Sequence, residues 1–115
     1  MEQEQIDLET IRGDDDGWIF EAFEDDGSPS DLSGCRFDLW IKPTSKGETI
    51  KLSTATGEIV IDGNQIIVVL SHDKTQGVKW TTATWDLQCT NSIGLIQTVS
   101  GTGNDFTLNH DVTGD

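Results

Sequence analysis

Hydrophobic and polar residues alternate along several short stretches of this chain, and the alternation predicts β-strands. In residues 35–42 the odd-numbered positions are apolar, and the even-numbered positions carry Arg36, Asp38, Trp40 and Lys42. Successive side chains of a strand point to opposite faces, so this segment predicts a strand with one buried face. Residues 21–34 before it contain an Asp-Gly pair, a proline and a Ser-Gly pair, which are typical of turns and polar connections.

Other segments show the same alternation of apolar and polar residues or form short apolar runs. They predict strands at residues 6–12, 18–23, 49–53, 58–62, 65–70, 82–90, 93–100 and 106–112. The pair Gly63-Asn64 between two of them is typical of a two-residue β-hairpin. Residues 71–79 are polar, and Ser71 and Gly77 fit the N-cap and C-cap of a single helical turn.

Two of these segments predict particular environments. In residues 18–23 apolar side chains fall on both faces, with Ile19 and Phe23 opposite the others, so we expect this strand to be covered on each side. In residues 93–100 the alternate positions from Ile93 to Val99 share one side of the predicted strand.

Short strands separated by turns every 8 to 12 residues, roughly, favour an all-β fold, a two-sheet antiparallel sandwich. We predict eight or nine strands. The 115 residues fit one domain, with no linker long enough to divide residues 1–115. Residues 1–5 are polar, and we expect them to be disordered.

Charge is the strongest feature of the composition, because seven Lys and Arg stand against 21 Asp and Glu, for a net charge of -14. Residues 1–38 hold 13 of the acids and two of the bases. Such an acidic surface repels phosphate backbones and anionic lipids, so neither nucleic acid nor a membrane is an expected partner. No apolar run is long enough to span a bilayer and no secretory signal begins the chain, which predicts synthesis in a cytoplasm.

The two cysteines, Cys35 and Cys89, both fall at apolar positions of predicted strands. This placement favours two buried free thiols over a disulfide in a reducing compartment. Trp40 follows Cys35 too closely for the disulfide pattern of immunoglobulin domains.

Clustered acids are the first candidates for a metal site, because calcium prefers several oxygen ligands. Asp14, Asp15 and Asp16 form such a run, but Trp18 stands where a helix-loop-helix calcium loop needs an oxygen ligand. Neighbouring acids in a loop are more often simply solvated.

Catalytic chemistry has no clear candidate in this sequence. His72 lies beside Asp73 on a polar loop, and neither it nor His110 is near a nucleophile motif. The many acids allow numerous carboxylate pairs and select none. We therefore expect a protein that is not an enzyme and holds no cofactor.

The tryptophans are the best candidates for a binding surface. Trp18 and Trp85 fall at core positions, whereas Trp40 is out of phase with its buried neighbours and is expected to be exposed. Trp40 and Trp80 are candidates for stacking on a sugar ring or for anchoring a protein interface.

The order of several short motifs resembles the N-terminal domain of phage baseplate upper proteins, among the structural proteins of tailed phages and prophages. The residues that carry the likeness are 26–34 (DGSPSDLSG), 41–43 (IKP), 52–59 (LSTATGEI), 66–71, 85–87 (WDL) and 111–113 (DVT). Two features depart from that family. Trp85 stands where Tyr is often found, and the chain ends at Asp115, where the family usually continues into a receptor-binding or linking region.

This resemblance implies an immunoglobulin-like β-sandwich that serves as a non-enzymatic structural or docking component of a phage tail or baseplate. The expected location is a virion assembled in the bacterial cytoplasm, and the expected partners are other tail or baseplate proteins, with a homo-oligomer by family analogy. The residues alone leave open an alternative from another class, a carbohydrate-binding module that uses an exposed Trp.

Overall fold

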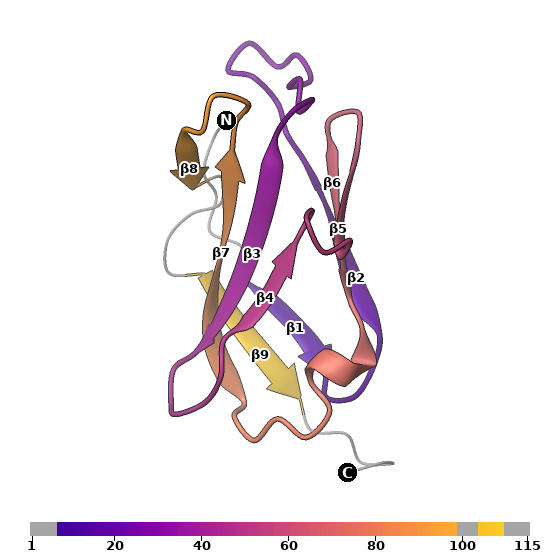
Figure 1. The fold of residues 1–115 in the computed structure, drawn as a ribbon. Coiled ribbons are helices and arrows are strands. Elements are labelled where there is room, and N and C mark those ends of the chain that lie inside the picture. The colour runs from indigo at the N-terminus through magenta and orange to yellow at the C-terminus, as the bar shows by residue number, and fades with distance from the viewer. Residues whose placement is uncertain (1–6, 99–103, 110–115) are drawn as a thin grey trace.

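Two sheets packed face to face make up the part of the chain that the computed structural model describes, residues 7–98 and 104–109 (Figure 1). The larger sheet has the strand order β1-β9-β7-β3-β4, and β8 also pairs with β7. Its strands are β1 (Leu8–Ile11), β3 (Arg36–Pro43), β4 (Ile50–Ser53), β7 (Thr82–Thr90), β8 (Ile96–Thr98) and β9 (Asn104–Asn109). The smaller sheet, β2-β6-β5, comprises β2 (Asp16–Glu21), β5 (Ile59–Asp62) and β6 (Gln65–Leu70).

Strand pairing is antiparallel throughout the described residues except between β1 and β9, which run parallel. The fold is thus the predicted two-sheet β-sandwich, and the parallel β1–β9 pair is its one departure from the expected antiparallel pairing among the described residues.

β3 and β7 form the centre of the larger sheet, and their alternation is confirmed. Phe37, Leu39 and Ile41 on β3 are all fully buried. They pair with Cys89, Leu87 and Trp85 of β7, which are also buried. Because both strands place apolar residues at the same phase, the sheet offers one continuous apolar face to the sheet opposite.

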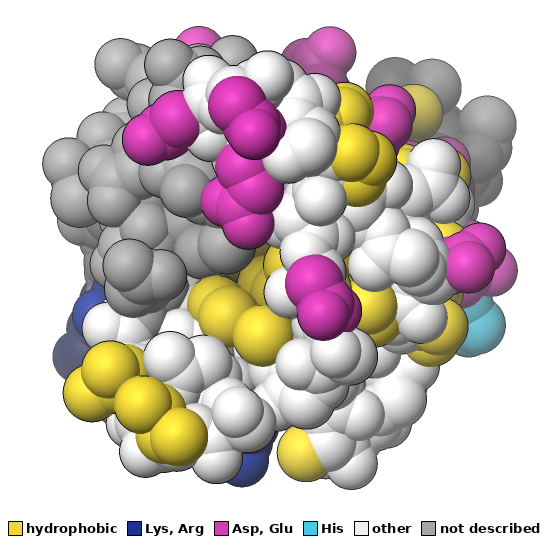
Figure 2. Space-filling model, turned by 90° about the horizontal axis from the view of Figure 1, so that it is seen from above, with side chains coloured by type: hydrophobic (Ala, Val, Ile, Leu, Met, Phe, Trp, Pro, Cys, Tyr) yellow, Lys and Arg dark blue, Asp and Glu magenta, His cyan; other side chains and the backbone are white. Residues whose placement is uncertain are grey.

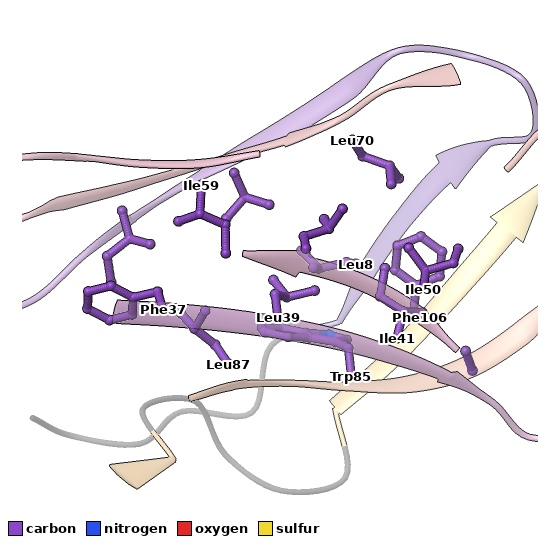
Figure 3. Close-up of a cluster of buried hydrophobic side chains, with 14 of the residues drawn as sticks. Leu8, Phe37, Leu39, Ile41, Ile50, Ile59, Leu70, Trp85, Leu87 and Phe106 are labelled. Atoms are coloured by element: carbon purple, nitrogen blue, oxygen red, sulfur yellow. The ribbon is translucent and has the colours of Figure 1, made fainter. Parts of the chain in front are cut away.

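The core lies between the sheets. Figure 3 shows Ile59 and Leu70 of the smaller sheet pointing toward Phe37 and Leu39 of the larger one. Phe106 on β9 closes one side of this core, with edge-on contacts to Trp18 at 6.0 Å and to Trp80 at 6.1 Å between ring centroids.

The hairpin predicted around Gly63-Asn64 is confirmed, since Asp62 of β5 pairs with Gln65 of β6. Gly63 has a φ of 61°, which suits the first position of a type II′ turn. The predicted helical turn is the 3-10 helix η1 (His72–Lys74).

Of the two predicted caps of this helix, Ser71 at the N-cap is confirmed and Gly77 at the C-cap is wrong. Ser71 stands at the N-cap, but its hydroxyl bonds the Asp73 carboxylate and makes no capping bond to a helix N–H. The C-cap is Thr75, and Gly77 lies beyond it, in the following turn.

β2 is covered on one face only, so the expectation of cover on both faces is wrong. Ile19 is 61% exposed, and Phe23, just beyond the strand, is 45% exposed. A strand with apolar residues on both faces is buried on both only if the fold packs another layer over its outer face. The described residues place no such layer over β2.

The strand predicted at residues 93–100 is shorter than its pattern. The side-chain oxygen of Asn91 accepts hydrogen bonds from the amides of Ile93 and Leu95, at 3.1 and 3.0 Å, and these bonds hold the chain in a turn. Ile93 and Leu95 are therefore exposed, and pairing with β7 starts only at Ile96. Val99 and Ser100 lie outside the described residues.

β9 begins at Asn104, two residues before the start of the strand predicted at residues 106–112. Its predicted last residues, 110–112, lie outside the described residues.

Candidate docking surfaces

Trp40 stands on the outer face of the larger sheet and is 38% exposed, as its phase predicts. β4 places Lys51 directly opposite it, and the Lys51 ammonium lies 4.4 Å from the centroid of the indole ring. Lys42, two residues along β3, lies 5.7 Å from the same centroid. On the other side Trp40 pairs with Asp86 of β7. The ring is therefore a cation-flanked aromatic group on an otherwise polar sheet face.

This arrangement bears on the two uses expected of Trp40. A sugar ring stacks on a free indole face, whereas here Lys51 takes up part of that space and would have to move. A protein partner with carboxylates could instead pair with Lys42 and Lys51 while covering the ring, as aromatic and cationic groups do together at interfaces.

Trp80, the second candidate, lies in the core and is only 6% exposed. Its ring packs against Phe106, and a Cβ added at Gly47 would come within 2.8 Å of it. The contacts that bury it come from residues distant in sequence, Gly47 and Phe106. Trp80 therefore offers no free ring for stacking.

A second candidate surface is the outer face of the smaller sheet, which we call the aliphatic face. It consists of Ile19, Val60, Ile67 and Val69. Ile67 of β6 pairs with Ile19 on one side and with Val60 on the other, so the three form a row across the sheet. Ile19, Val60 and Val69 are 61%, 51% and 47% exposed.

The aliphatic face is bordered by acids. β2 carries Asp16 and Glu21, β5 carries Asp62, and the three strands of this sheet contain no Lys or Arg. Figure 2, seen from one end of the sandwich, shows patches of hydrophobic and acidic side chains, with Lys and Arg only near the margin of the view. Sequence reasoning missed this face because it took Ile19 for a buried residue.

The acidic run Asp14–Asp16 does not form a compact set of oxygen ligands. Asp15 instead accepts hydrogen bonds from His72, from its backbone N–H at 2.6 Å and from its ring Nδ1 at 2.9 Å. Asp16 accepts from the amide of Gly17 at 2.8 Å. Among residues 7–98 and 104–109, no group of three or more His, Cys, Asp or Glu side chains is placed to hold a metal ion.

The Asp15–His72 contact perturbs both groups. The pKa of His72 is raised because its ring hydrogen-bonds Asp15 and because Asp15 and Asp73 are negative. The pKa of Asp15 is lowered by the hydrogen bonds from His72. With both side chains exposed and no nucleophile motif beside them, this pair ties the turn after β1 to η1.

Cys35 and Cys89 are both free thiols. Burial, with a smaller contribution from a hydrogen bond with Cys35, raises the pKa of Cys89 to about 11. A thiol with so high a pKa stays protonated at neutral pH and is a poor nucleophile. The pair therefore belongs to the packing of β3 and β7.

Comparison with protein-family models finds no match to this chain, and comparison with curated proteins finds no relative. In the described part of the chain no helix is long and apolar enough to cross a membrane. The functional argument therefore rests on the surfaces described above.

Proposed function

We propose that this chain is a non-enzymatic docking domain that binds other proteins, and that it works as a structural component of a phage or prophage tail or baseplate. The observation that carries the docking role is the aliphatic face, where the exposed Ile19 and Val60 flank the half-buried Ile67 in a row across a sheet. Exposed apolar patches of this kind mark protein interaction sites. The tail or baseplate setting rests on the sequence resemblance.

The aliphatic face and its neighbouring acids predict the chemistry of the partner surface. It is apolar at its centre, to cover the aliphatic face, and basic at its edge, to meet Glu21 and Asp62. A second copy of this chain presenting the same face would bring these acids together, so a different tail or baseplate protein fits this face better. The virion is then the place where the domain acts.

The test is incorporation into particles. Bacteria that produce the particle would express tagged variants, and mass spectrometry would measure the tagged chain in gradient-purified particles. Val60→Lys puts a charge on the aliphatic face and is expected to lower incorporation by roughly tenfold. Ser45→Lys makes the same charge change in an exposed loop and should be incorporated like the wild type. Absence of the wild-type chain from particles would refute the proposed setting.

The alternative, a carbohydrate-binding module, is favoured by the exposure of Trp40. Titration with soluble oligosaccharides, followed by Trp fluorescence, separates the two functions. Saturable quenching that Trp40→Ala abolishes would establish sugar binding, and the proposed docking function predicts no such response. The solution mass of wild type and Trp40→Ala, measured by light scattering, shows whether Trp40 holds copies of the chain together.

A further inference from the structure

An open groove of about 550 Å³ lies at the lower end of the sandwich in Figure 1. One wall is the β3–β4 loop with the first half of β4, and the other is the segment from η1 to Trp80. The walls come from separate parts of the sequence, residues 46–51 and 73–80, and the fold brings them together.

The groove concentrates positive charge in an acidic protein. Four of the seven bases of the chain line it, and these are Lys46, Lys51, Lys74 and Lys79. Only two acids, Glu48 and Asp73, stand among them, so the lining has a net charge of +2 where the whole chain has -14. Lys74 is 3.8 Å from the carboxylate of Glu58 and is partly neutralised by it.

The lining also has an apolar component. Ile50 and Trp80 are buried and Val78 is half-buried, and all three reach the groove. Gly47 lets the loop backbone lie close to Trp80, because a side chain there would collide with the ring. An apolar lining with cationic groups suits a ligand that has both carboxylates and apolar side chains.

A free strand edge lies beside the groove, because β4 ends the strand order of its sheet within the described residues. The amide of Thr54 donates to the carbonyl of Phe37 at 3.0 Å. Hydrogen-bonded and non-hydrogen-bonded residue pairs alternate along two antiparallel strands, so Leu52 and Ile50 are the next residues of β4 that hydrogen-bond β3. Lys51, between them, therefore directs its backbone N–H and C=O away from β3.

The far end of this edge is already used, since the amide of Ser53 donates to the Glu58 carboxylate at 3.2 Å. The groove takes in residues 48–51, which are the last two residues of the loop and the first two of β4. It thus reaches the first half of the β4 edge, with the open backbone groups of Lys51 beside the lysine side chains.

We infer that this groove binds an extended acidic segment of a partner protein, which adds a strand to the edge of β4 while its carboxylates pair with Lys46, Lys51 and Lys79. Backbone bonds to an edge supply affinity in this mode, and side chains on the two flanks supply specificity. Lysines on an edge oppose pairing with another copy of the same edge and favour an acidic strand. This site is separate from the aliphatic face and does not depend on it.

The test uses the full chain and three synthetic peptides in calorimetry and NMR. The first alternates Glu and Val, the second has Gln in place of every Glu, and the third is the first with alternate backbone nitrogens methylated to remove edge hydrogen bonds. We expect the first to bind with shifts at the amides of Thr49 and Lys51, and the other two to bind at least roughly tenfold more weakly.

Matched variants distinguish the effect of the groove lysines from the effect of net charge on peptide affinity. Lys46→Glu with Lys79→Glu is expected to weaken binding of the Glu-Val peptide by roughly tenfold or more. Arg36→Glu, at the opposite end of β3 from the groove, changes the net charge by as much as Lys46→Gln with Lys79→Gln does and should leave affinity within about threefold. Lys46→Gln with Lys79→Gln tests the same positions without adding acids, and the dispersion of NMR resonances verifies that each variant is folded.

Several results would overturn the inference. These are no binding of the Glu-Val peptide, equal loss of affinity in the groove variants and in Arg36→Glu, or equal binding of the N-methylated peptide. Inorganic phosphate that displaces the peptide at similar concentration would assign the groove to small anions. A dimer that the groove variant dissociates would assign it to a second copy. Because Val60→Lys leaves the groove intact, failure of the aliphatic face and failure of the groove are distinguishable.

Discussion

His72 and Asp15 form a contact between side chains 57 residues apart, and its pH dependence can be worked out from the chemistry. The charged imidazole is favoured in the fold, so the pKa of His72 lies above its ordinary value of about 6.5. The contact stabilises the fold fully when the pH is below the pKa of a free histidine side chain, and this stabilisation is lost as the pH rises through the raised pKa of His72. We expect an NMR titration of the His72 ring to give a pKa above the ordinary value.

Asp15→Asn is the matched control for that titration, because the amide keeps the shape of the side chain and removes its charge. In this variant the pKa of His72 should move back toward the ordinary value, with a smaller residual increase from Asp73. A wild-type titration at or below the ordinary pKa would contradict the contact. His72→Gln identifies which resonance belongs to this histidine.

Among the strands, β9 contributes Phe106 to the core, and this residue is fully buried. Its ring is held edge-on by Trp18 of β2 and by Trp80, so it joins the two sheets. Phe106→Ala should lower the free energy of unfolding by about 3–5 kcal/mol, because it leaves a cavity between them. Thr107→Ala, at the next position of β9, should cost less than about 1 kcal/mol. Urea unfolding followed by circular dichroism measures both, and equal costs would contradict this role of Phe106.

The strands that could be predicted from sequence are those whose side chains alternate cleanly. In β3 and β7 every second residue is apolar, from Phe37 to Ile41 and from Ala83 to Cys89, and the structure buries these residues. The two-residue period determines which face of a strand is buried, because a shift of the pairing by one residue would expose all of its apolar side chains. The Gly63-Asn64 hairpin was equally predictable from its turn residues.

Other features depend on contacts that a linear pattern does not contain. The pattern of β2 cannot show whether a layer covers Ile19, since a buried strand and an exposed docking face have the same residues. The side chain of Asn91 delays β8 by bonding the amides of Ile93 and Leu95, and Trp80 is buried by Phe106 from 26 residues further along. The groove beside β4 had only one signal in the sequence. Within residues 42–79, bases slightly outnumber acids in an otherwise acidic chain.

At the scale of the whole molecule, the described residues present charge and apolar surface in three places. The smaller sheet presents the aliphatic face with acids around it, the larger sheet presents Trp40 with Lys42 and Lys51, and the groove beside β4 gathers four lysines. Lys51 belongs to both of the cationic places. A domain with such separate surfaces can hold two or more different partners, which is what a structural part of an assembly requires.

The net charge of -14 predicts how the stability of the whole domain responds to salt. Acids repel one another in the compact state more than in the unfolded chain, and ions screen this repulsion. Raising NaCl from about 10 to about 100 mM shortens the screening length from about 30 to about 10 Å. We therefore expect Tm to rise by several degrees, since about 1 kcal/mol corresponds to about 4 °C in a domain of this size. Glu24→Gln with Asp25→Asn, two exposed changes in the acidic third, should reduce this rise. A Tm that falls with salt would mean that attractive pairs, such as Lys74 with Glu58, outweigh the repulsion among acids.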